Sequence, residues 1–276
     1  SGVSTVSHNY LKGCNYCGMV KLTCFWKFGG KFMGIHFEQF GQRADSTELS
    51  FTAMSGRYKI QEYGLKRSIL DIIEKLQINP EDRLLDVGCG VGNITIALSM
   101  MVAHTTCIDH VKVLSVFKKR LPMDEIDFIP GNFLDIDISG EFDKILSYGV
   151  VMCLPAAPDV IRFIDKMVCL LAPGGRMLIG DLPNINKKKR FNESKIGQDF
   201  AKEWSQLMSD PDNQREIEWT IKNVEIPENS AIFDDQFMSE LLLRYRTQGF
   251  DTYILQQPSD LAFGHTREDL LIIRPN

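Results

Sequence analysis

The stretch Arg83-Leu84-Leu85-Asp86-Val87-Gly88-Cys89-Gly90-Val91-Gly92-Asn93 decides the fold of this 276-residue chain. An apolar run that ends in alternating glycines is typical of a buried parallel strand followed by a tight turn into a helix. Upstream, apolar residues recur every three or four positions over residues 56–77, which predicts an amphipathic helix. Downstream, we expect a short helix at 93–102.

Segments typical of strands and helices alternate beyond this turn. Such alternation predicts an α/β fold, with a Rossmann-like, doubly wound and mostly parallel sheet. Further strands are expected at 105–109, 126–130, 142–148 and 175–181, with helices at 111–121 and 159–171. A helix at 233–248 then precedes two closing strands at 252–255 and 269–274. We therefore expect seven strands, the last of them antiparallel, plus a helical insertion.

Composition divides the chain into four parts. Residues 1–45 form an N-terminal extension, and a core domain that holds the glycine-rich turn spans residues 46–183. Residues 184–230 are polar and predict a helical insertion, which would act as a substrate lid over the carboxyl ends of the strands. Residues 231–276 would complete the core sheet.

The N-terminal extension differs in composition from the rest of the chain. Its first 32 residues contain four lysines, no acid and three of the seven cysteines. Ser1-Gly2 resembles the remnant of an expression tag, and Met33 would then serve as the native start. Cys14, Cys17 and Cys24 with His8 form only a weak zinc pattern, because a single cysteine pair has loosely placed partners. We therefore expect no metal.

The charge balance limits the classes of partner. With 31 Lys and Arg against 36 Asp and Glu, the formal net charge is −5, so neither nucleic acid nor an anionic membrane surface is an expected partner. No stretch approaches the roughly 18 consecutive apolar residues of a membrane span. We expect a cytoplasmic protein and consider a homodimer as its oligomeric state. The basic run 187–190 is most simply a solvated face, with phosphate recognition as the alternative.

The residues around the glycine-rich turn indicate which ligand it holds. A dinucleotide-binding turn needs a third glycine at position 93, where this chain has Asn93. Asp86 would repel a pyrophosphate, whereas it would attract an ammonium group. Asp109, at the end of the next expected strand, can accept hydrogen bonds from both hydroxyls of a ribose. A nucleoside with an amino-acid tail suits both acids.

Together these residues resemble class I S-adenosylmethionine-dependent methyltransferases. Residues 84–93 are similar to the first motif of that family, and residues 107–110 are similar to its ribose-binding second motif. Three further motifs follow in the family's order, at 130–133, 142–155 and 171–179. The C-terminal residues 264–274 resemble, more weakly, small-molecule methyltransferases of bacterial sugar and cell-surface biosynthesis.

The resemblance implies S-adenosylmethionine as the cofactor and S-adenosylhomocysteine as its product. Asp86 would organise the turn and bind the amino group, while Asp109 would bind the ribose. The full set of cofactor residues that the resemblance implies is Asp86, Gly88, Cys89, Gly90, Asp109, His110, Asn132, Phe133, Ser147 and Tyr148.

The resemblance also implies roles around the adenine and the methionine end. His110 would flank the adenine, and Asn132 with the Phe133 amide would read the adenine edge. Ser147 and Tyr148 would line the methionine end. Because Asn132 stands where the family usually has Asp, we expect retained but weaker cofactor binding.

Methyl transfer to a hydroxyl needs alignment and removal of a proton. Alignment supplies several kcal/mol of the barrier, and a base is often worth about a hundredfold in rate. The candidate bases near the expected strand ends are Asp181 and His265. His104 would lie at the opposite edge of the sheet.

The resemblance therefore implies an enzyme that methylates a hydroxyl of a small polar acceptor, such as a sugar or nucleotide sugar. Two alternatives stay open: transfer to nitrogen or carbon of another metabolite or of RNA, and a non-catalytic cofactor-binding partner subunit. RNA is disfavoured because residues 147–150 lack the Asn/Asp-Pro-Pro-aromatic motif that is associated with base amines.

Overall fold

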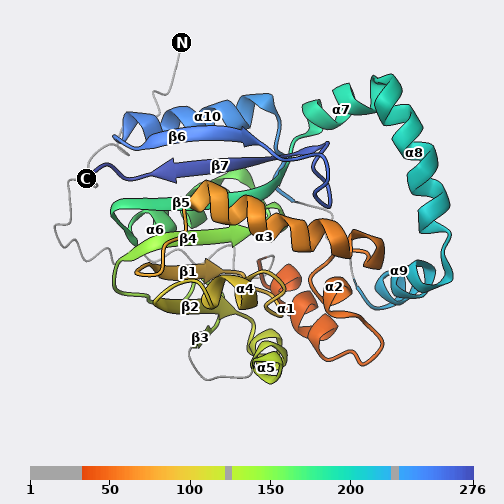
Figure 1. Cartoon of the computed structure of the whole chain (residues 1–276), viewed down its shortest axis with the longest axis horizontal. Helices are drawn as coiled ribbons and strands as arrows, with labels where there is room; N and C mark the ends of the chain where they lie inside the picture. The colour runs from red at the N-terminus through yellow and green to blue at the C-terminus, as the bar shows by residue number, and fades with distance from the viewer. Residues whose placement is uncertain (1–32, 122–125, 225–229) are drawn as a thin grey trace, which may run out of the picture. The chain divides into compact units, whose positions relative to one another are not determined.

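The computed structural model describes residues 33–121, 126–224 and 230–276 (Figure 1). The described residues belong to one compact unit. The cysteine-rich stretch, with the candidate zinc ligands Cys14 and Cys17, lies outside the described residues.

Seven strands form one sheet in the order β3-β2-β1-β4-β5-β7-β6. The strands are β1 (Arg83–Val87), β2 (His104–Asp109), β3 (Ile126–Pro130), β4 (Phe142–Tyr148), β5 (Leu171–Pro183), β6 (Asp251–Gln256) and β7 (Arg267–Ile273). The first five are parallel, and β7 runs antiparallel to both β5 and β6. The predicted Rossmann-like sheet with an antiparallel last strand is confirmed.

Alternate residues of the central strands face opposite layers of helices. Leu84 packs with Ile72 of the helix before β1, whereas Leu85 packs with Phe163 of the helix after β4. Strands that are buried on both faces explain why the sequence shows nearly continuous apolar runs rather than strict alternation. The doubly wound arrangement follows from this two-sided burial.

The helices in chain order are α1 (Met33–Ala44), α2 (Phe51–Met54), the 3₁₀ turn η1 (Lys59–Gln61), α3 (Glu62–Leu76), α4 (Thr95–Ser99), α5 (Val111–Arg120), the 3₁₀ turn η2 (Val151–Cys153), α6 (Ala157–Val168), α7 (Ile185–Glu193), α8 (Lys195–Met208), α9 (Pro211–Asn223) and α10 (Asp235–Thr247). The helix expected over 56–77 begins only at Glu62, because the Tyr58 N–H donates to the Gln61 side chain (3.0 Å) and closes η1 first. At its other end, Gln77 adopts a left-handed φ of 52° and stops α3.

Helix α1 lies in the stretch that the sequence assigns to an N-terminal extension, yet it belongs to the compact unit. The ring of its Phe37 meets the His110 ring edge-on, with centroids 5.0 Å apart. Gly41 permits this approach, because a Cβ there would lie 2.4 Å from the His110 ring. Packing against the start of α5 therefore fixes α1 on the core.

The predicted helical insertion consists of α7, α8 and α9 (Figure 1). Its far end contacts residues on either side of α2: the N–H of Ser50, the N-cap of α2, donates to Glu216 (3.1 Å), and the Ile60 N–H of η1 donates to Asn213 (3.2 Å). The insertion is therefore held against residues 50–60 at α9.

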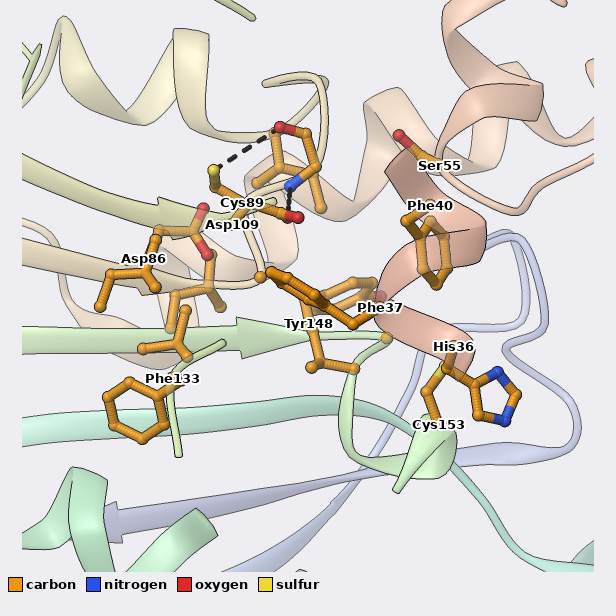
Figure 2. A pocket seen from close by; sticks show the side chains of 18 of the residues that line it. His36, Phe37, Phe40, Ser55, Asp86, Cys89, Asp109, Phe133, Tyr148 and Cys153 are labelled. Atoms are coloured by element: carbon orange, nitrogen blue, oxygen red, sulfur yellow. Dashed lines mark hydrogen bonds between the residues drawn. The ribbon is translucent and has the colours of Figure 1, made fainter. Parts of the chain in front are cut away.

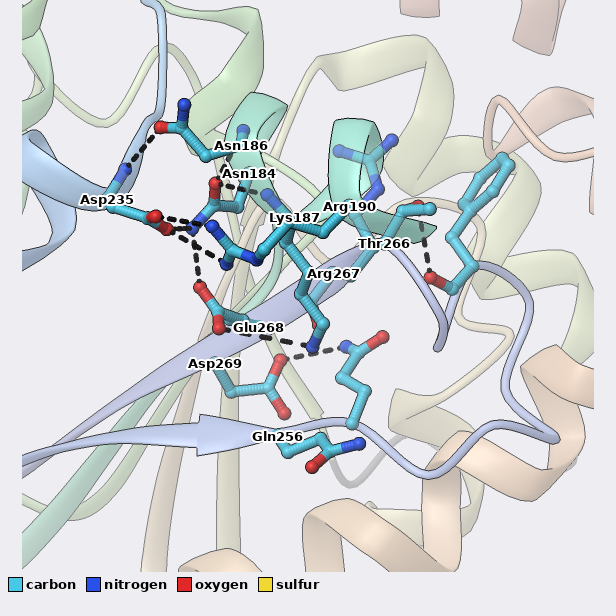
Figure 3. A network of polar contacts seen from close by, with 12 residues as sticks. Asn184, Asn186, Lys187, Arg190, Asp235, Gln256, Thr266, Arg267, Glu268 and Asp269 are labelled. Carbon is cyan, nitrogen blue, oxygen red and sulfur yellow. Dashed lines mark hydrogen bonds and ion pairs between the residues drawn. The ribbon is translucent and has the colours of Figure 1, made fainter. Parts of the chain in front are cut away.

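The beginning of the insertion is held by a polar network (Figure 3). Asn184 donates to Asp235 (2.8 Å) and to Glu268 (2.9 Å), and Arg190 pairs with Asp235 (2.6 Å). Lys187 donates to the Arg267 carbonyl (2.7 Å). Two members of the basic run 187–190 thus bind the protein itself, so the run is only partly the solvated face that the sequence suggests.

No helix in the described ranges has the length and apolar character that crossing a bilayer requires.

Candidate functional site

A pocket opens at the carboxyl ends of β1, β2 and β4, where the strand order reverses (Figure 2). Open α/β sheets bind ligands at this place, because the loops diverge there and leave a crevice. The residues that line it are Asp86 and Val87 of β1 and Gly88–Gly90 after it, Ile108 and Asp109 of β2, Gly131–Phe133 after β3, Leu146 and Tyr148 of β4 with Gly149 and Val150 after it, His36, Phe37 and Phe40 of α1, and Ser55, Arg57, Leu65, Asn93, Ile94, Cys153, Leu154 and Phe163.

The glycine-rich turn forms one wall of this pocket. Gly88 has a φ of +82°, and a Cβ there would lie 2.4 Å from Val150. Gly90 has a φ of +58°, and its N–H donates to Asp109 Oδ2 (2.8 Å). Cys89 between them is buried, and its Sγ donates to the Gly90 carbonyl (3.5 Å). The two glycines therefore let the backbone approach a ligand while they hold Asp109 in place.

Asp86 and Asp109 are two buried acids in the same pocket. Asp86 is 2 % exposed and accepts a hydrogen bond from Thr95 Oγ1 (2.5 Å). Burial, with a smaller contribution from the nearby Asp109, raises the pKa of Asp86 to about 7, although the hydrogen bond from Thr95 opposes the shift. Burial also raises the pKa of Asp109 to about 6, although the N–H groups of His110 and Gly90 oppose the shift. Neither carboxylate forms an ion pair within the described chain. A cationic or hydroxyl-rich ligand would therefore supply the countercharge or hydrogen bonds that both carboxylates lack.

Asn132 and Phe133 line the pocket next to these acids. Asn132 Oδ1 accepts the Leu134 N–H (3.2 Å), which uses one of its two lone pairs. Phe133 is buried, with its ring edge-on to Phe163 at 5.0 Å. The structure thus brings together the residues that the resemblance assigns to the adenine edge and those assigned to the ribose.

Ser147 and His110 lie outside the pocket lining. Ser147 is 1 % exposed and donates to the Val87 carbonyl (3.0 Å), which ties β4 to β1. His110 caps α5, since its Nδ1 accepts the Lys112 N–H (3.2 Å), and α1 covers its ring. The structure gives both residues contacts within the protein rather than a place in the pocket.

Tyr148 presents part of its side chain to the pocket (Figure 2). Its hydroxyl donates to Ser68 Oγ (3.2 Å) and accepts from Gln257 (3.0 Å). Burial, with the charges of Asp181 and Asp269, raises the pKa of Tyr148 well above its ordinary value. Tyr148 therefore stays protonated and serves as a wall rather than as a base.

Asp181, the first predicted base, is 2 % exposed and lies beside the pocket rather than in its lining. Its carboxylate pairs with Arg57 and, at 3.8 Å, with Arg267. Burial raises the pKa of Asp181, and the two guanidinium groups oppose this shift. A carboxylate that is shared by two guanidinium groups is a poor proton acceptor, because protonation would break both pairs.

His265, the second predicted base, also lies outside the lining. Its ring stacks on Phe191 with centroids 4.5 Å apart and an interplanar angle of 8°, and it meets Phe200 edge-on. Burial, and then Lys187, lower the pKa of His265. His265 thus joins the insertion to the loop before β7. His104 begins β2, at the opposite edge of the sheet, where it pairs with Asp127 (3.0 Å).

The sequence missed the pocket residues that come from α1 and from the segment after α2. His36 lines the pocket, and its Nε2 is buried without a hydrogen-bond partner in the described part of the structure. Burial lowers the pKa of His36, so its imidazole is neutral at neutral pH. The spacing of Phe37, Phe40 and Ala44 is a helical signal that could have extended the core to α1. Nothing in the sequence pattern singles out Arg57.

The pocket lining contains no residue of the insertion among those described, so the lid role of residues 184–230 stays a prediction. Residues 33–121, 126–224 and 230–276 contain no group of three or more His, Cys, Asp or Glu side chains arranged to hold a metal ion.

The central part of the chain matches a known protein family. Residues 85–179 match the family described as "Methyltransferase domain". The malonyl-[acyl-carrier protein] O-methyltransferase of Haemophilus ducreyi is 24 % identical over 178 residues, which is 60 % of this chain and 67 % of that protein. The ubiquinone biosynthesis O-methyltransferase of Xylella fastidiosa is 30 % identical over 118 residues, which is 41 % of this chain and 47 % of that protein. The matches thus span about half to two thirds of these relatives.

A solved structure supports the same fold. The N-methyltransferase NodS of Bradyrhizobium japonicum WM9, in complex with S-adenosylhomocysteine, superposes with a TM-score of 0.56 over 88 % of this chain and 100 % of NodS, at 14 % identity. The matched residues 85–179 contain the glycine-rich turn, Asp109, Asn132 and Tyr148.

Proposed function

We propose that this chain, whose residues 85–179 form a class I S-adenosylmethionine-dependent methyltransferase domain, transfers a methyl group to a hydroxyl of a small polar acceptor. S-adenosylmethionine supplies a methyl group that is already activated by its sulfonium charge. The protein therefore has to hold this cofactor, align the acceptor and take up one proton.

One observation carries the cofactor site. Two buried carboxylates, which form no ion pair among the described residues, flank a turn of positive-φ glycines in the same pocket. Asp86 would bind the ammonium group of the cofactor, since that cation offsets the cost of the buried carboxylate. Asp109 would accept the ribose hydroxyls, and Asn132 with Phe133 would border the adenine. Gly88 and Gly90 would leave room for the ligand beside the backbone.

We assign the proton acceptor to His36 rather than to Asp181 or His265. His36 lines the same pocket, and its buried Nε2 has no hydrogen-bond partner among the described residues, whereas Asp181 is paired with two arginines and His265 is stacked in the insertion. As the acceptor oxygen takes the methyl group, its O–H proton would pass to Nε2 of the neutral His36. Two of the curated proteins that this chain matches, those of Haemophilus ducreyi and Xylella fastidiosa, are named O-methyltransferases, which supports oxygen as the accepting atom; other matches carry the names of rRNA and demethylmenaquinone methyltransferases.

The experiment is incubation with isotope-labelled S-adenosylmethionine and a panel of sugars, nucleotide sugars and small hydroxy acids, with mass detection of the methylated product. Product formation is expected with a hydroxyl acceptor, and Asp109→Ala should reduce it at subsaturating cofactor because cofactor binding is weakened. Methylation only at nitrogen or carbon would refute the hydroxyl assignment and leave the methyltransferase itself intact.

A further inference from the structure

Arg57 is the one Lys or Arg side chain among the described residues that line the pocket. It lies between α2 and η1 and is 12 % exposed. Gly149, directly after β4, makes room for it: a Cβ there would lie 2.8 Å from Arg57 Nη2 and 3.6 Å from Asp181 Oδ2. The guanidinium group therefore reaches the carboxyl ends of β4 and β5.

Asp181 fixes this guanidinium group in place. It sits at an irregularity of β5 between Ile179 and Leu182, with a left-handed φ of 62°. Its N–H donates to Asp269 Oδ1 (2.8 Å), and Asp269 in turn pairs with Lys75 (2.7 Å). The left-handed φ and the hydrogen bond of the N–H fix the backbone of Asp181 and so set the direction of its side chain, and Asp181 acts as a positioning residue for Arg57.

A second arginine shares the same carboxylate. Arg267 Nε lies 3.8 Å from Asp181 Oδ1, and its backbone is held by Lys187 in the network of Figure 3. Both guanidinium groups rest on the Phe263 ring, with Cζ atoms 5.2 Å (Arg57) and 4.9 Å (Arg267) from its centroid. Two guanidinium groups thus share the one Asp181 carboxylate at this wall of the pocket, while Asp269 pairs with Lys75, which also pairs with Asp71.

Arg57 and the two acids of the pocket lie at the ends of different strands. Asp86 and Asp109 stand at the ends of β1 and β2, whereas Arg57 stands at the ends of β4 and β5. Arg57 Nη1 makes only a long contact with the Gly56 carbonyl (3.5 Å). A poorly solvated cation with donors to spare favours an anionic ligand.

We propose that Arg57 binds an anionic group, a carboxylate or phosphate, on the methyl acceptor. This inference rests on the proposed function, since it names the class of acceptor that the same pocket takes. The planar fork of arginine fits the oxygens of either group. The acceptor is then an acidic hydroxy compound rather than a neutral sugar.

The test uses malonate as a simple dicarboxylate probe and its neutral analogue malonamide, each titrated into the protein loaded with S-adenosylhomocysteine. Malonate should bind and malonamide should not. Arg57→Gln should weaken malonate binding at least about tenfold, and Arg57→Lys should lose less, because the charge remains while the fork is lost. Arg190→Gln, at an exposed arginine that pairs with Asp235, is the matched control and should bind malonate as the wild type does.

Affinity for S-adenosylhomocysteine separates the outcomes. It should be retained in both Arg57 variants, which also shows that they fold. If Arg57→Gln weakens S-adenosylhomocysteine and leaves malonate unchanged, Arg57 binds the cofactor's own carboxylate and the proposal is wrong. If S-adenosylhomocysteine binds but malonate binds no better than malonamide, the acceptor inference alone fails. If S-adenosylhomocysteine does not bind the wild type, the proposed function fails, and the inference fails with it. Should Arg57→Gln not fold, malonate affinity unchanged in Arg57→Lys overturns the proposal, and a several-fold loss supports it.

Discussion

Asp86 is a buried carboxylate whose desolvation no neighbouring cation in the described structure offsets. Its pKa of about 7 in the folded protein lies above the ordinary 3.8. The proton that Asp86 retains therefore stabilises the fold fully below about pH 4, and this contribution is lost as the pH rises through about 7. Above that pH the ionised carboxylate destabilises the ligand-free protein.

Asp86→Asn should therefore stabilise the ligand-free protein at about pH 8, by on the order of 1–4 kcal/mol in the free energy of unfolding. The same change should weaken S-adenosylmethionine at least about tenfold, because the ammonium group loses its counterion. Urea unfolding and calorimetry measure the two effects. Near pH 4, where Asp86 is protonated, the stability difference should vanish; a variant that is less stable at about pH 8 and binds equally well would contradict the assignment.

His36→Gln should lower kcat for the acceptor at least about a hundredfold and leave cofactor affinity unchanged, since the residue acts only on the hydroxyl proton. The neutral imidazole is the active form, and burial lowers the pKa of His36. Wild-type activity should therefore fall as the pH drops through that lowered pKa, below the ordinary value for histidine. A pH–rate profile checks this: the variant should lack the acid limb, and the same limb in both proteins would place the base elsewhere.

At the residue scale, spacing along one strand and turn was enough to predict several side chains that share the pocket. Asp86, Gly90 and Asp109 line it because each lies near the end of a strand or in the turn that follows, and their binding of the cofactor stays a prediction. His36 and Arg57 were missed because tertiary packing brings them there from a helix and an irregular segment far upstream. Ser147 points at the neighbouring strand, and a period-2 pattern cannot tell which face of a strand lines a crevice.

At the element scale, the glycine-rich turn also depends on its packing against α5. Gly92 has a φ of +82°, and a Cβ there would lie 2.4 Å from the Phe117 ring. Gly140 has a φ of +107°, and a Cβ there would meet nothing within 4 Å. Replacing Gly140 by alanine therefore measures the cost of the backbone conformation alone, without a steric collision. Gly92→Ala should cost about 1–3 kcal/mol more than Gly140→Ala in the free energy of unfolding. Equal losses by urea denaturation would mean that the turn does not pack as described.

Helix α1 is held to the core through Gly41 and His110. Gly41→Ala should loosen α1, because the added Cβ would meet the His110 ring at 2.4 Å. Hydrogen exchange of the α1 amides should become faster in this variant, and the wall of the pocket that α1 forms should become less stable. Adding His110→Ala removes the collision, so the double variant should recover protection relative to Gly41→Ala. Additive losses in the two variants would show that the two residues do not meet.

Among the elements, the strands were predicted more accurately than the helix ends. The predicted bounds of β4 (Phe142–Tyr148) match those of the structure, although Asp143 and Lys144 interrupt its apolar residues. Local hydrogen bonds shifted the helix starts, as at η1. Strand β5 extends past its predicted bounds at both ends, because Leu171 pairs with Phe142 of β4 and because pairing with β7 continues past the irregularity at Asp181.

At the scale of the whole molecule, composition separated residues 1–45 from the core, whereas the structure groups residues 31–276 together. Composition shows charge and cysteine content, but it does not show which apolar side chains pack against the core. The consequence is functional, because α1 supplies one wall of the pocket and α9 packs on the segment that holds Arg57.

Binding of S-adenosylmethionine, measured by calorimetry, tests the central claim most directly. The wild type should bind with micromolar-scale affinity, and Asp109→Ala should bind at least about tenfold more weakly, because the ribose hydroxyls lose a charged acceptor. Asp127→Ala is the matched control: it removes an exposed acid of β3 that pairs only with His104 in the described structure, and it should bind as the wild type does. No binding by the wild type, or equal affinity in Asp109→Ala, would contradict the account.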